Sequence, residues 1–436
     1  MSKLQKYKDS MFDAMAMAEH QGASAVKITF NHVEGISTSF ENGRLRYADS
    51  SESMSFAIMV IVDGKFGWSA ANQPEMLKEM IGRAVKLAQV GAPAHYTTFP
   101  KTAEKYADIA SHDSAAASIP RSKLIDDCGS LVAHIKSLHP SMVARASGSR
   151  SFGETISVFN TGLVDEFEDS SWSINADFSK TTGTDMLFSS AGRSWGKLDN
   201  HYDLNYIKEK LTEDFQYGSL NARLPDGDYP LLLPPSYVRR FLAPVVMALS
   251  GYRVYLGVSP LKDKLGQTPF HPSFSLIDDP FIDYFGSSAN MDSCGIPTQK
   301  RTLIENGRVC QFLYDYDTAC MVNAEPTGNS DCAPYNTLLP TGTVHSAELF
   351  KGISRGIYIK KLLGFGQSNF ANGDFSANVQ LGYVIENGEI TGRIKDAMIA
   401  GNVFEMLSRP VVTSSDVDPC TLTPFLLFDS VKLFSK

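Results

Sequence analysis

The sequence predicts an α+β protein of two domains, each with an antiparallel sheet and a few helices, in which the C-terminal domain is mostly β. The chain of 436 residues is longer than one ordinary hydrophobic core organises, so more than one domain is expected. Apolar residues make up 43% and charged residues 20%, a composition typical of globular proteins. The tripeptide Glu-Asn-Gly occurs at 41–43, 305–307 and 386–388, each time between β-forming residues.

Each Glu-Asn-Gly is expected at the tip of a β-hairpin. In a two-residue type I′ turn both central residues have φ > 0, and Asn followed by Gly adopts this conformation at low steric cost. Leu303 and Ile304 before the second tip, and Val309 after it, are the apolar residues that two paired strands need. Recurrent turn chemistry explains the repetition, and a local duplication is the alternative.

The elements of the first hundred residues follow from their periodicity. Residues 3–20 have apolar side chains at helical spacing and predict a helix, and residues 25–70 alternate as antiparallel strands do. Residues 73–91 return to helical spacing, with Gly91 as the expected C-cap. The stretch 91–120 is rich in Pro, Ala and Ser and predicts an ordered crossing with little regular structure.

The next elements lead to a domain boundary. Residues 121–138 predict a helix, residues 142–195 a series of strands with turn residues between them, and residues 204–220 a closing helix. Pro, Asp and Gly then cluster at 223–230, which is typical of a linker between domains.

We therefore expect an N-terminal α+β domain at 1–222 and a C-terminal β-rich domain at 223–436. Within the second, residues 237–250 predict one buried helix despite Pro244. Nearly everything after Gly251 predicts strands separated by turns.

Charge and cysteine usage exclude several classes of protein. Forty Lys and Arg stand against forty-eight Asp and Glu, a net charge of −8, and no long basic run is present, so no nucleic-acid partner is expected. The first 22 residues lack the apolar core of a signal peptide and no later stretch is long enough to span a membrane, which predicts a cytoplasmic protein without a membrane partner. The six cysteines, irregularly spaced and without a CxxC pair, predict reduced and mostly buried thiols.

Two groups of residues are weak candidates for a metal site. His134 and His139 are five residues apart, but Ile135 follows the first, so no general-base carboxylate accompanies them, and helix-surface histidines are the commoner arrangement. The stretch 276–283 crowds Asp278, Asp279 and Asp283, which could hold a hard cation, although a solvated turn is the favoured interpretation.

Two short motifs have simpler explanations than catalysis. Ser259 to Lys262 matches Ser-x-x-Lys, but so short a string arises by chance. The stretch 364–369, Gly-Phe-Gly-Gln-Ser-Asn, lacks the third glycine and following helix of a phosphate cradle, so a tight loop is expected.

Six strings of the C-terminal half are more informative together than singly. They lie at 248–267, 278–280, 295–309, 325–330, 356–369 and 372–390. They occur in the order found in the TldD/PmbA family, which the chain resembles, specifically in its PmbA (TldE) branch. The resemblance is dense over the C-terminal half and looser over the N-terminal half, where the helix, the hairpins and the string Phe-Glu-Asn-Gly-Arg-Leu-Arg at 40–46 carry it.

The resemblance implies that this chain has lost a zinc site. The TldD branch looks like a zinc metallopeptidase whose HExxxH motif supplies two histidine ligands and a glutamate that activates water. An ungapped alignment of its Gly-x-Ser with residues 257–259 places that motif on Leu242, Ala243 and Met247. A thioether is a poor zinc ligand and Leu and Ala offer none, so no catalytic residue, metal or cofactor is expected here, and zinc is expected only in a TldD-like partner.

The resemblance further implies a non-catalytic subunit of a TldD/TldE-type system for proteolysis and maturation of short or unfolded peptides. Its expected partner is a TldD-like metallopeptidase subunit or a second copy of the chain. Candidate peptide-binding residues are Thr327, Gly328 and Asn329, because the string is common to both branches and a glycine lets backbones approach closely. One departure is Cys294, which stands where the family usually has an acidic residue.

Two alternatives stay open. The first is a stand-alone metallopeptidase with an unrecognised site, with ligands from the Asp278, Asp279 and Asp283 group or from the two histidines. The second is a direct modulator of DNA gyrase, an older label of the branch, which the acidic balance disfavours.

Overall fold

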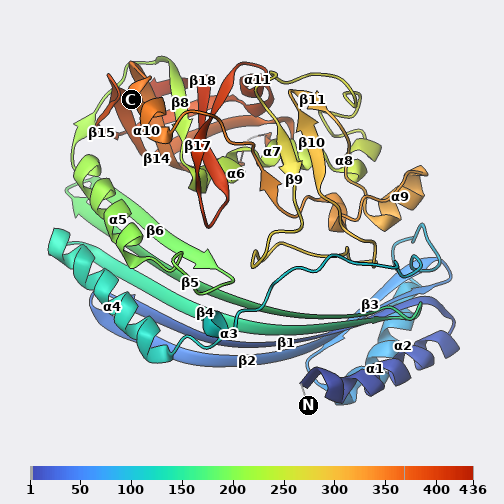
Figure 1. Ribbon diagram of the computed structural model, residues 1–436. Coiled ribbons are helices and arrows are strands. Elements are labelled where there is room, and N and C mark those ends of the chain that lie inside the picture. The colour runs from blue at the N-terminus through green and yellow to red at the C-terminus, as the bar shows by residue number, and fades with distance from the viewer. Residues whose placement is uncertain (1–2, 368, 436) are drawn as a thin grey trace.

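The fold has two parts, a long curved sheet and a β-rich C-terminal part that lies over one of its faces (Figure 1). The structure is a computed structural model that describes residues 3–367 and 369–435. Helices account for 25% of the chain and strands for 41%, in antiparallel sheets, which confirms the predicted α+β class.

The first sheet has six antiparallel strands in the order β3-β2-β1-β4-β5-β6. Its central strands are long, and each pairs with its neighbour over almost its whole length. The bounds are β1 Ala23–Glu41, β2 Arg44–Val62, β3 Lys65–Ala71, β4 Val143–Phe159, β5 Val164–Thr182 and β6 Asp185–Trp195.

Helices cover one face of this sheet at its two ends. Ile28 and Phe30 of β1 are buried with residues of α1 (Lys3–His20) and α2 (Leu77–Ala88). Farther along β1, Ile36 and Phe40 pack with the cluster around α4 (Arg121–Leu138) and α5 (Leu204–Gly218). Because side chains alternate along a strand, the odd-numbered residues of β1 face the other way, toward the C-terminal part.

The main C-terminal sheet closes into a barrel-like ring. Its order is β13-β8-β18-β16-β14-β15-β7, with β17 on β18, and β13 also pairs with β14. The bounds are β7 Asn221–Ala222, β8 Gly227–Leu233, β13 Arg355–Leu363, β14 Asp374–Glu386, β15 Glu389–Ile394, β16 Ala397–Asn402, β17 Val411–Asp418 and β18 Thr423–Ser435. The boundary expected near residue 223 stays a prediction.

A smaller sheet and short helices complete the C-terminal part. The sheet runs β11-β10-β9-β12, with bounds Leu276–Asp278 (β9), Arg301–Glu305 (β10), Arg308–Val309 (β11) and Thr337–Leu338 (β12). The short helices are α8 Gly251–Tyr255, α9 Tyr316–Val322, α10 Ser346–Lys351 and α11 Val403–Leu407, and α3 (Ser114–Ala117) interrupts the 91–120 crossing. Single 3-10 turns lie at Pro74–Met76, Ser330–Cys332 and Phe370–Asn372.

The three Glu-Asn-Gly turns are hairpin tips, as predicted. Asn42, Asn306 and Asn387 have φ of 51°, 46° and 50°, and the glycine after each also has positive φ. The flanking residues pair across each tip, as Glu305 does with Arg308.

Two helix predictions need correction. The single helix expected over 237–250 is two helices, α6 (Pro235–Phe241) and α7 (Ala243–Ala248), that meet at Leu242. Pro244 explains the break, because proline lacks an N–H and fits only the first turn of a helix.

Gly91 is not a helix cap, because α2 ends at Ala88 with Gln89 as the right-handed C-cap. It has another role: a Cβ at Gly91 would lie 1.9 Å from the Phe66 carbonyl oxygen, so a close backbone approach requires the glycine.

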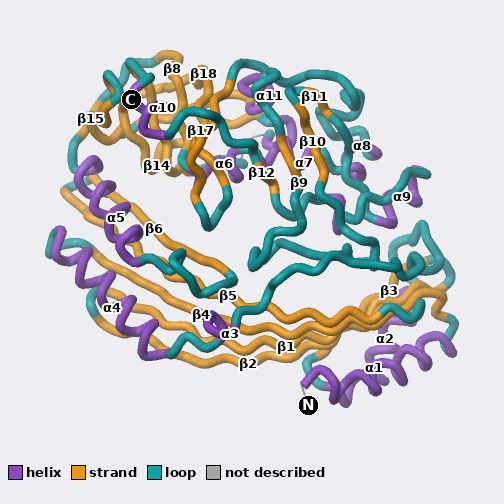
Figure 2. Tube along the Cα trace, viewed as in Figure 1, coloured by secondary structure: helices purple, strands orange, loops and turns teal. Residues whose placement is uncertain are grey.

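The prediction of strand after Gly251 was also too broad. Figure 2 shows long loops between the curved sheet and the barrel, and much of 256–300 has no regular structure. Turn-rich sequence predicts chain reversals, but it does not distinguish paired strands from ordered loops.

All six cysteines are free thiols, as predicted, but only Cys128 and Cys332 are buried and Cys320 is exposed. In residues 3–367 and 369–435, every helix is too short or too polar to cross a bilayer.

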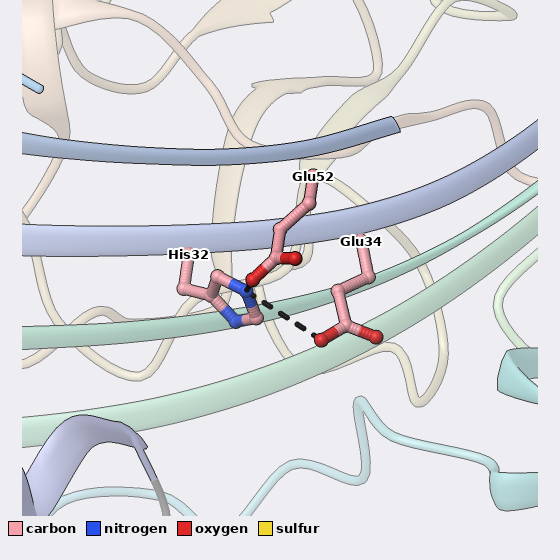
Figure 3. A group of neighbouring side chains, drawn as sticks. All are labelled: His32, Glu34 and Glu52. Atoms are coloured by element: carbon pink, nitrogen blue, oxygen red, sulfur yellow. Dashed lines mark hydrogen bonds and ion pairs between the residues drawn. The ribbon is translucent and has the colours of Figure 1, made fainter. Parts of the chain in front are cut away.

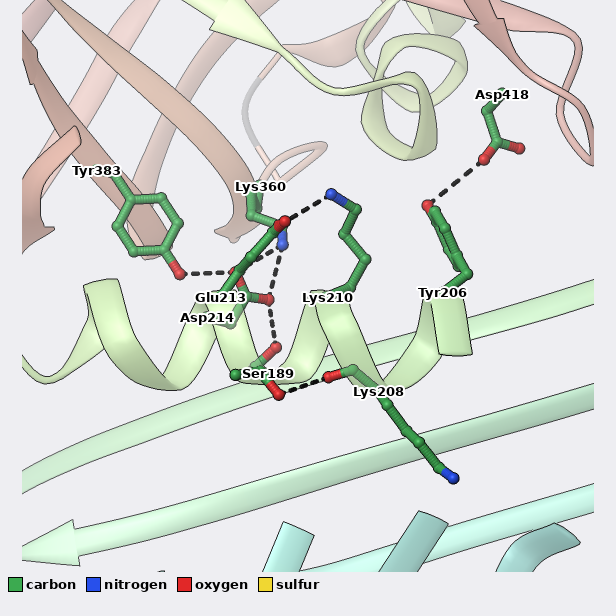
Figure 4. A network of polar contacts seen from close by, with 10 residues as sticks. Ser189, Tyr206, Lys208, Lys210, Glu213, Asp214, Lys360, Tyr383 and Asp418 are labelled. Atoms are coloured by element: carbon green, nitrogen blue, oxygen red, sulfur yellow. Dashed lines mark hydrogen bonds and ion pairs between the residues drawn. The ribbon is translucent and has the colours of Figure 1, made fainter. Parts of the chain in front are cut away.

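A buried polar network joins the two parts of the chain (Figure 4). Asp214 of α5 accepts hydrogen bonds from Ser189 of β6 at 2.5 Å and from Tyr383 of β14 at 2.8 Å. Lys360 of β13 donates to both oxygens of the same carboxylate, at 2.6 and 2.7 Å. One carboxylate thus fixes the end of the curved sheet against the barrel.

Candidate functional site

A cleft lies between the helix-free face of the curved sheet and the C-terminal loops. Lys27 and Thr29 of β1 lie on this face, opposite Ile28 and Phe30. The Lys27 ammonium donates a hydrogen bond to the Ser293 carbonyl at 2.8 Å, which ties a C-terminal loop to the sheet. The cleft contains two cavities of different chemistry.

The first, which we call the β3 pocket, has a volume of about 260 Å³ and lies at the β3 end of the cleft. Its walls are aromatic, with acidic residues also in the lining; they include Phe66, Trp68, Tyr96, Tyr316, Asp315, Asp317 and Asp331. Cys294 also lines this pocket, and burial, with the nearby Asp292, raises the pKa of its thiol to about 12. Burial thus favours the neutral thiol at neutral pH, which favours a packing role for Cys294 over that of a nucleophile.

The second, which we call the α6 cavity, has a volume of about 620 Å³. Serines of β4, β5 and β6 form its floor, and Arg239 of α6 lies on the opposite wall. The loop around Tyr284 closes one side, where the Gly196 N–H donates to the Tyr284 carbonyl at 3.1 Å. The tip of the β17–β18 hairpin closes another, held by an ion pair of 3.3 Å between Arg193 and Asp418.

The three positions predicted to replace HExxxH offer no zinc ligands. Leu242 is 1% exposed and joins α6 to α7, while Ala243 and Met247 lie within α7. One position therefore lies at the junction of two short helices and the other two lie in α7, and none carries an imidazole, carboxylate or thiolate. These residues do not fit the zinc that the TldD branch implies.

The predicted peptide-binding string is bonded inside the fold. The Thr327 hydroxyl donates to the Tyr314 carbonyl at 3.0 Å and accepts from the Tyr314 N–H at 2.9 Å. Asn329 is 1% exposed and donates to the Asp278 carboxylate at 2.8 Å. Gly328 has φ of +72°, and a Cβ there would lie 2.4 Å from the Pro297 carbonyl oxygen. The string shapes the loops over the cleft, and a direct contact with peptide stays a prediction.

The three predicted aspartates have separate partners. Asp278 is buried and accepts from Asn329 and two backbone N–H groups; burial raises its pKa, although these hydrogen bonds oppose the shift. Asp279 pairs with Lys300 at 2.7 Å, and Asp283 accepts from a backbone N–H at 2.9 Å. They do not converge on one point as metal ligands would.

The other short motifs are structural. His134 contacts a threonine hydroxyl of α5 at 2.9 Å, and His139 contacts a serine hydroxyl two residues further along. The Ser259 hydroxyl donates to the Ala248 carbonyl at the end of α7 at 2.6 Å and accepts from the Leu261 N–H at 3.1 Å, so it holds a turn against that helix. In the stretch 364–369 the two glycines have positive φ, as the predicted tight loop requires, and residue 368 lies outside the described residues.

One cluster that the sequence did not reveal joins His32, Glu34, Glu52 and Glu154 (Figure 3 draws the first three). The His32 Nε2 atom lies 3.1 Å from Glu52 and 3.6 Å from Glu34, and Nδ1 lies 3.0 Å from the buried Glu154. Ligand atoms of the first three lie within 4.8 Å of one another, and in the described part of the chain this is the group that could hold a metal ion.

The His32 cluster lies away from the cleft. Strand alternation puts His32 on the face of Ile28 and Phe30, which the helices cover. An imidazole between carboxylates is also the arrangement of a structural ion-pair network, so the geometry alone does not make this cluster an active site. Sequence reasoning missed it because strand pairing brings its members together: His32 lies 20 residues from Glu52 and 122 residues from Glu154 in the chain.

The fold and cleft define a class of two-part α+β proteins in which a curved sheet closes against a barrel-like domain. The chain belongs to the PmbA/TldD metallopeptidase family. Residues 226–434 match the PmbA/TldA metallopeptidase C-terminal domain, and residues 26–88 match domain 1 of the same family.

Relatives agree in sequence and in fold. A metalloprotease from Methanothermobacter thermautotrophicus is 26% identical over 86% of this chain and 85% of its own. A proposed modulator of a DNA gyrase from Thermotoga maritima superposes with a TM-score of 0.88, at 23% identity, over 98% of this chain and all of its own. TldE from Thermococcus kodakarensis superposes with a TM-score of 0.87, at 22% identity and with the same coverage. These two solved structures therefore share the fold of this chain.

Proposed function

We propose that this chain is a non-catalytic subunit of a TldD/PmbA-type metalloprotease system that takes up short or unfolded peptides. The observation that carries the proposal is the donor-free set Leu242, Ala243 and Met247 at the positions aligned with HExxxH. Without two imidazoles and a carboxylate, a zinc ion and its activated water have no place there. A TldD-like partner would supply the zinc.

The cleft supports the peptide part of the proposal. It lies between the curved sheet and the barrel, and β6 is one of the two terminal strands of that sheet among the described residues. An extended peptide can add to a strand edge through backbone hydrogen bonds. Such binding depends on the peptide backbone more than on its side chains. A folded protein could not add in this way, so the subunit would select unfolded chains.

The expected assembly is a dimer with a TldD-like subunit or with a second copy. Sheet edges that are left open favour such pairing. Light scattering at tens of micromolar should therefore report a dimer, alone or after addition of the partner. A monomer under both conditions would rule out this part of the proposal.

The function is tested by peptide cleavage with the chain alone, the TldD-like partner alone, and both together. We expect no cleavage by the chain alone and faster cleavage by the mixture than by the partner. A partner whose HExxxH glutamate is replaced by glutamine is the control, because it should abolish the activity of the mixture. Chelator-sensitive cleavage by the chain alone would refute the proposal.

A stand-alone metallopeptidase is the second candidate. The predicted aspartate and histidine ligands do not converge, so this candidate now depends on the His32 cluster, whose ligand atoms do. Zinc-dependent cleavage that disappears in His32→Asn would favour it. Direct action on DNA gyrase remains the third hypothesis, and the net charge of −8 disfavours contact with DNA.

A further inference from the structure

Arg239 lies on the wall of the α6 cavity and has no counter-ion in the described part of the chain. Among the described residues its one polar or ring contact is with Phe285, whose ring centre lies 5.7 Å from the guanidinium carbon. Burial lowers the pKa of Arg239, and no neighbouring carboxylate contributes to that shift. Since an arginine stays charged in a protein, a positive charge faces this cavity.

The rest of the wall combines serines with aromatic residues, and one carboxylate lies among its described residues. Ser149 and Ser173 share a hydrogen bond of 2.9 Å across the floor, and Ser171 is bonded in the same way to Ser151 at 2.8 Å. Asp169 also lines the cavity but forms no ion pair with Arg239 in the described structure. The cavity thus offers a cation without an ion-pair partner among the described residues, together with several hydroxyl groups.

We propose that Arg239 binds a carboxylate of the peptide, so that the α6 cavity is a carboxylate subsite of the cleft. A guanidinium matches a carboxylate with two parallel hydrogen bonds, and serine hydroxyls can donate to the same group. The volume of about 620 Å³ falls in the range of roughly 300–1,000 Å³ that is usual for small-ligand pockets.

This inference rests on the proposed function, because it needs a peptide in the cleft. The carboxylate could be the C-terminus or an Asp or Glu side chain, since the chemistry at Arg239 is the same. The cavity lies beside β6, since Ser194 near the end of this strand lines it. A peptide bound along β6 could therefore present either its C-terminus or an acidic side chain to the cavity. The experiment must therefore vary the two sources separately.

The probe is a fluorescent unstructured peptide in three forms: a free acid with one internal Glu, the same peptide as a C-terminal amide, and the free acid with Glu changed to Gln. Fluorescence anisotropy measures binding to wild type, Arg239→Gln and Arg240→Gln. Arg240 is the matched control because it is exposed on the same helix. Circular dichroism and thermal unfolding establish that each variant is folded. If Arg239→Gln does not fold, Arg239→Met replaces it, because it also removes the charge.

We expect Arg239→Gln to weaken binding of the free acid by about ten-fold or more, as loss of a charge-assisted pair does. One of the two neutralised peptides should bind wild type as weakly as the free acid binds Arg239→Gln, and should not weaken further with that variant. Arg240→Gln should bind like wild type. Equal effects of Arg239→Gln on all three peptides, or none, would overturn the carboxylate subsite while the proposed function stands. If no form binds wild type, the proposed function and the subsite both fail.

Discussion

Lys360 of β13 and Asp214 of α5 form a buried ion pair across the junction between the curved sheet and the barrel, with their side chains 15% and 2% exposed. Lys360→Met should leave the Asp214 carboxylate buried without its ammonium partner. We expect a loss of about 3–5 kcal/mol in the free energy of unfolding, measured by urea denaturation.

The control for this pair is Lys351→Met, which breaks an exposed ion pair with Glu348 whose side chains are 68% and 58% exposed. That change should alter stability by less than about 1 kcal/mol. Equal losses for both lysines would contradict the assigned role of Asp214 at the junction.

Asp185 gives a prediction for the dependence of stability on pH. Burial opposes the shift, but hydrogen bonds from Arg393 and Lys395 lower the pKa of Asp185 below 3.8 in the folded chain. A carboxylate whose pKa is lower in the folded chain than in the unfolded chain stabilises the fold at pH values above its unfolded pKa. This stabilisation is lost as the pH falls through the folded pKa. The free energy of unfolding of wild type should therefore exceed that of Asp185→Asn by a constant amount between pH 6 and 8. This difference should shrink below pH 3.8. A difference that stays constant down to pH 2.5 would disprove the linkage.

Gly328 and Gly22 form a matched pair for backbone strain. Both have positive φ, but a Cβ at Gly328 would lie 2.4 Å from the Pro297 carbonyl oxygen, whereas a Cβ at Gly22 meets nothing within 4 Å. Gly22→Ala should cost about 1–2 kcal/mol for its conformation alone. Gly328→Ala should cost roughly 1–3 kcal/mol more because the loop must shift. If thermal unfolding shows similar losses of stability for both variants, the 325–330 loop accommodates the added Cβ without strain.

The elements that the sequence could predict are those with local causes. The Glu-Asn-Gly tips depend on the φ preference of two adjacent residues, and α4 matches its predicted range because its apolar spacing is complete within 121–138. The break at Leu242 also had a local signal in Pro244, but the continuous apolar run outweighed it.

The candidate site was less predictable because its contacts are distant in sequence. Asn329 meets Asp278 across 51 residues, and His32 meets Glu154 across 122. Nothing in the sequence marks Arg239 as different from Arg240, since only the packing of α6 over the cleft leaves the first on a cavity wall. Alternation in β1 shows which residues share a face, but not which domain covers that face.

The most direct test of the central claim is the zinc content of the purified full-length chain, measured by elemental analysis after equilibration with zinc and removal of the excess. The account predicts far less than one zinc per chain, since Leu242, Ala243 and Met247 provide no ligands. The same measurement on His32→Asn determines whether any residual metal belongs to the His32 cluster. About one zinc per chain, retained in His32→Asn and required for peptide cleavage, would contradict a non-catalytic subunit.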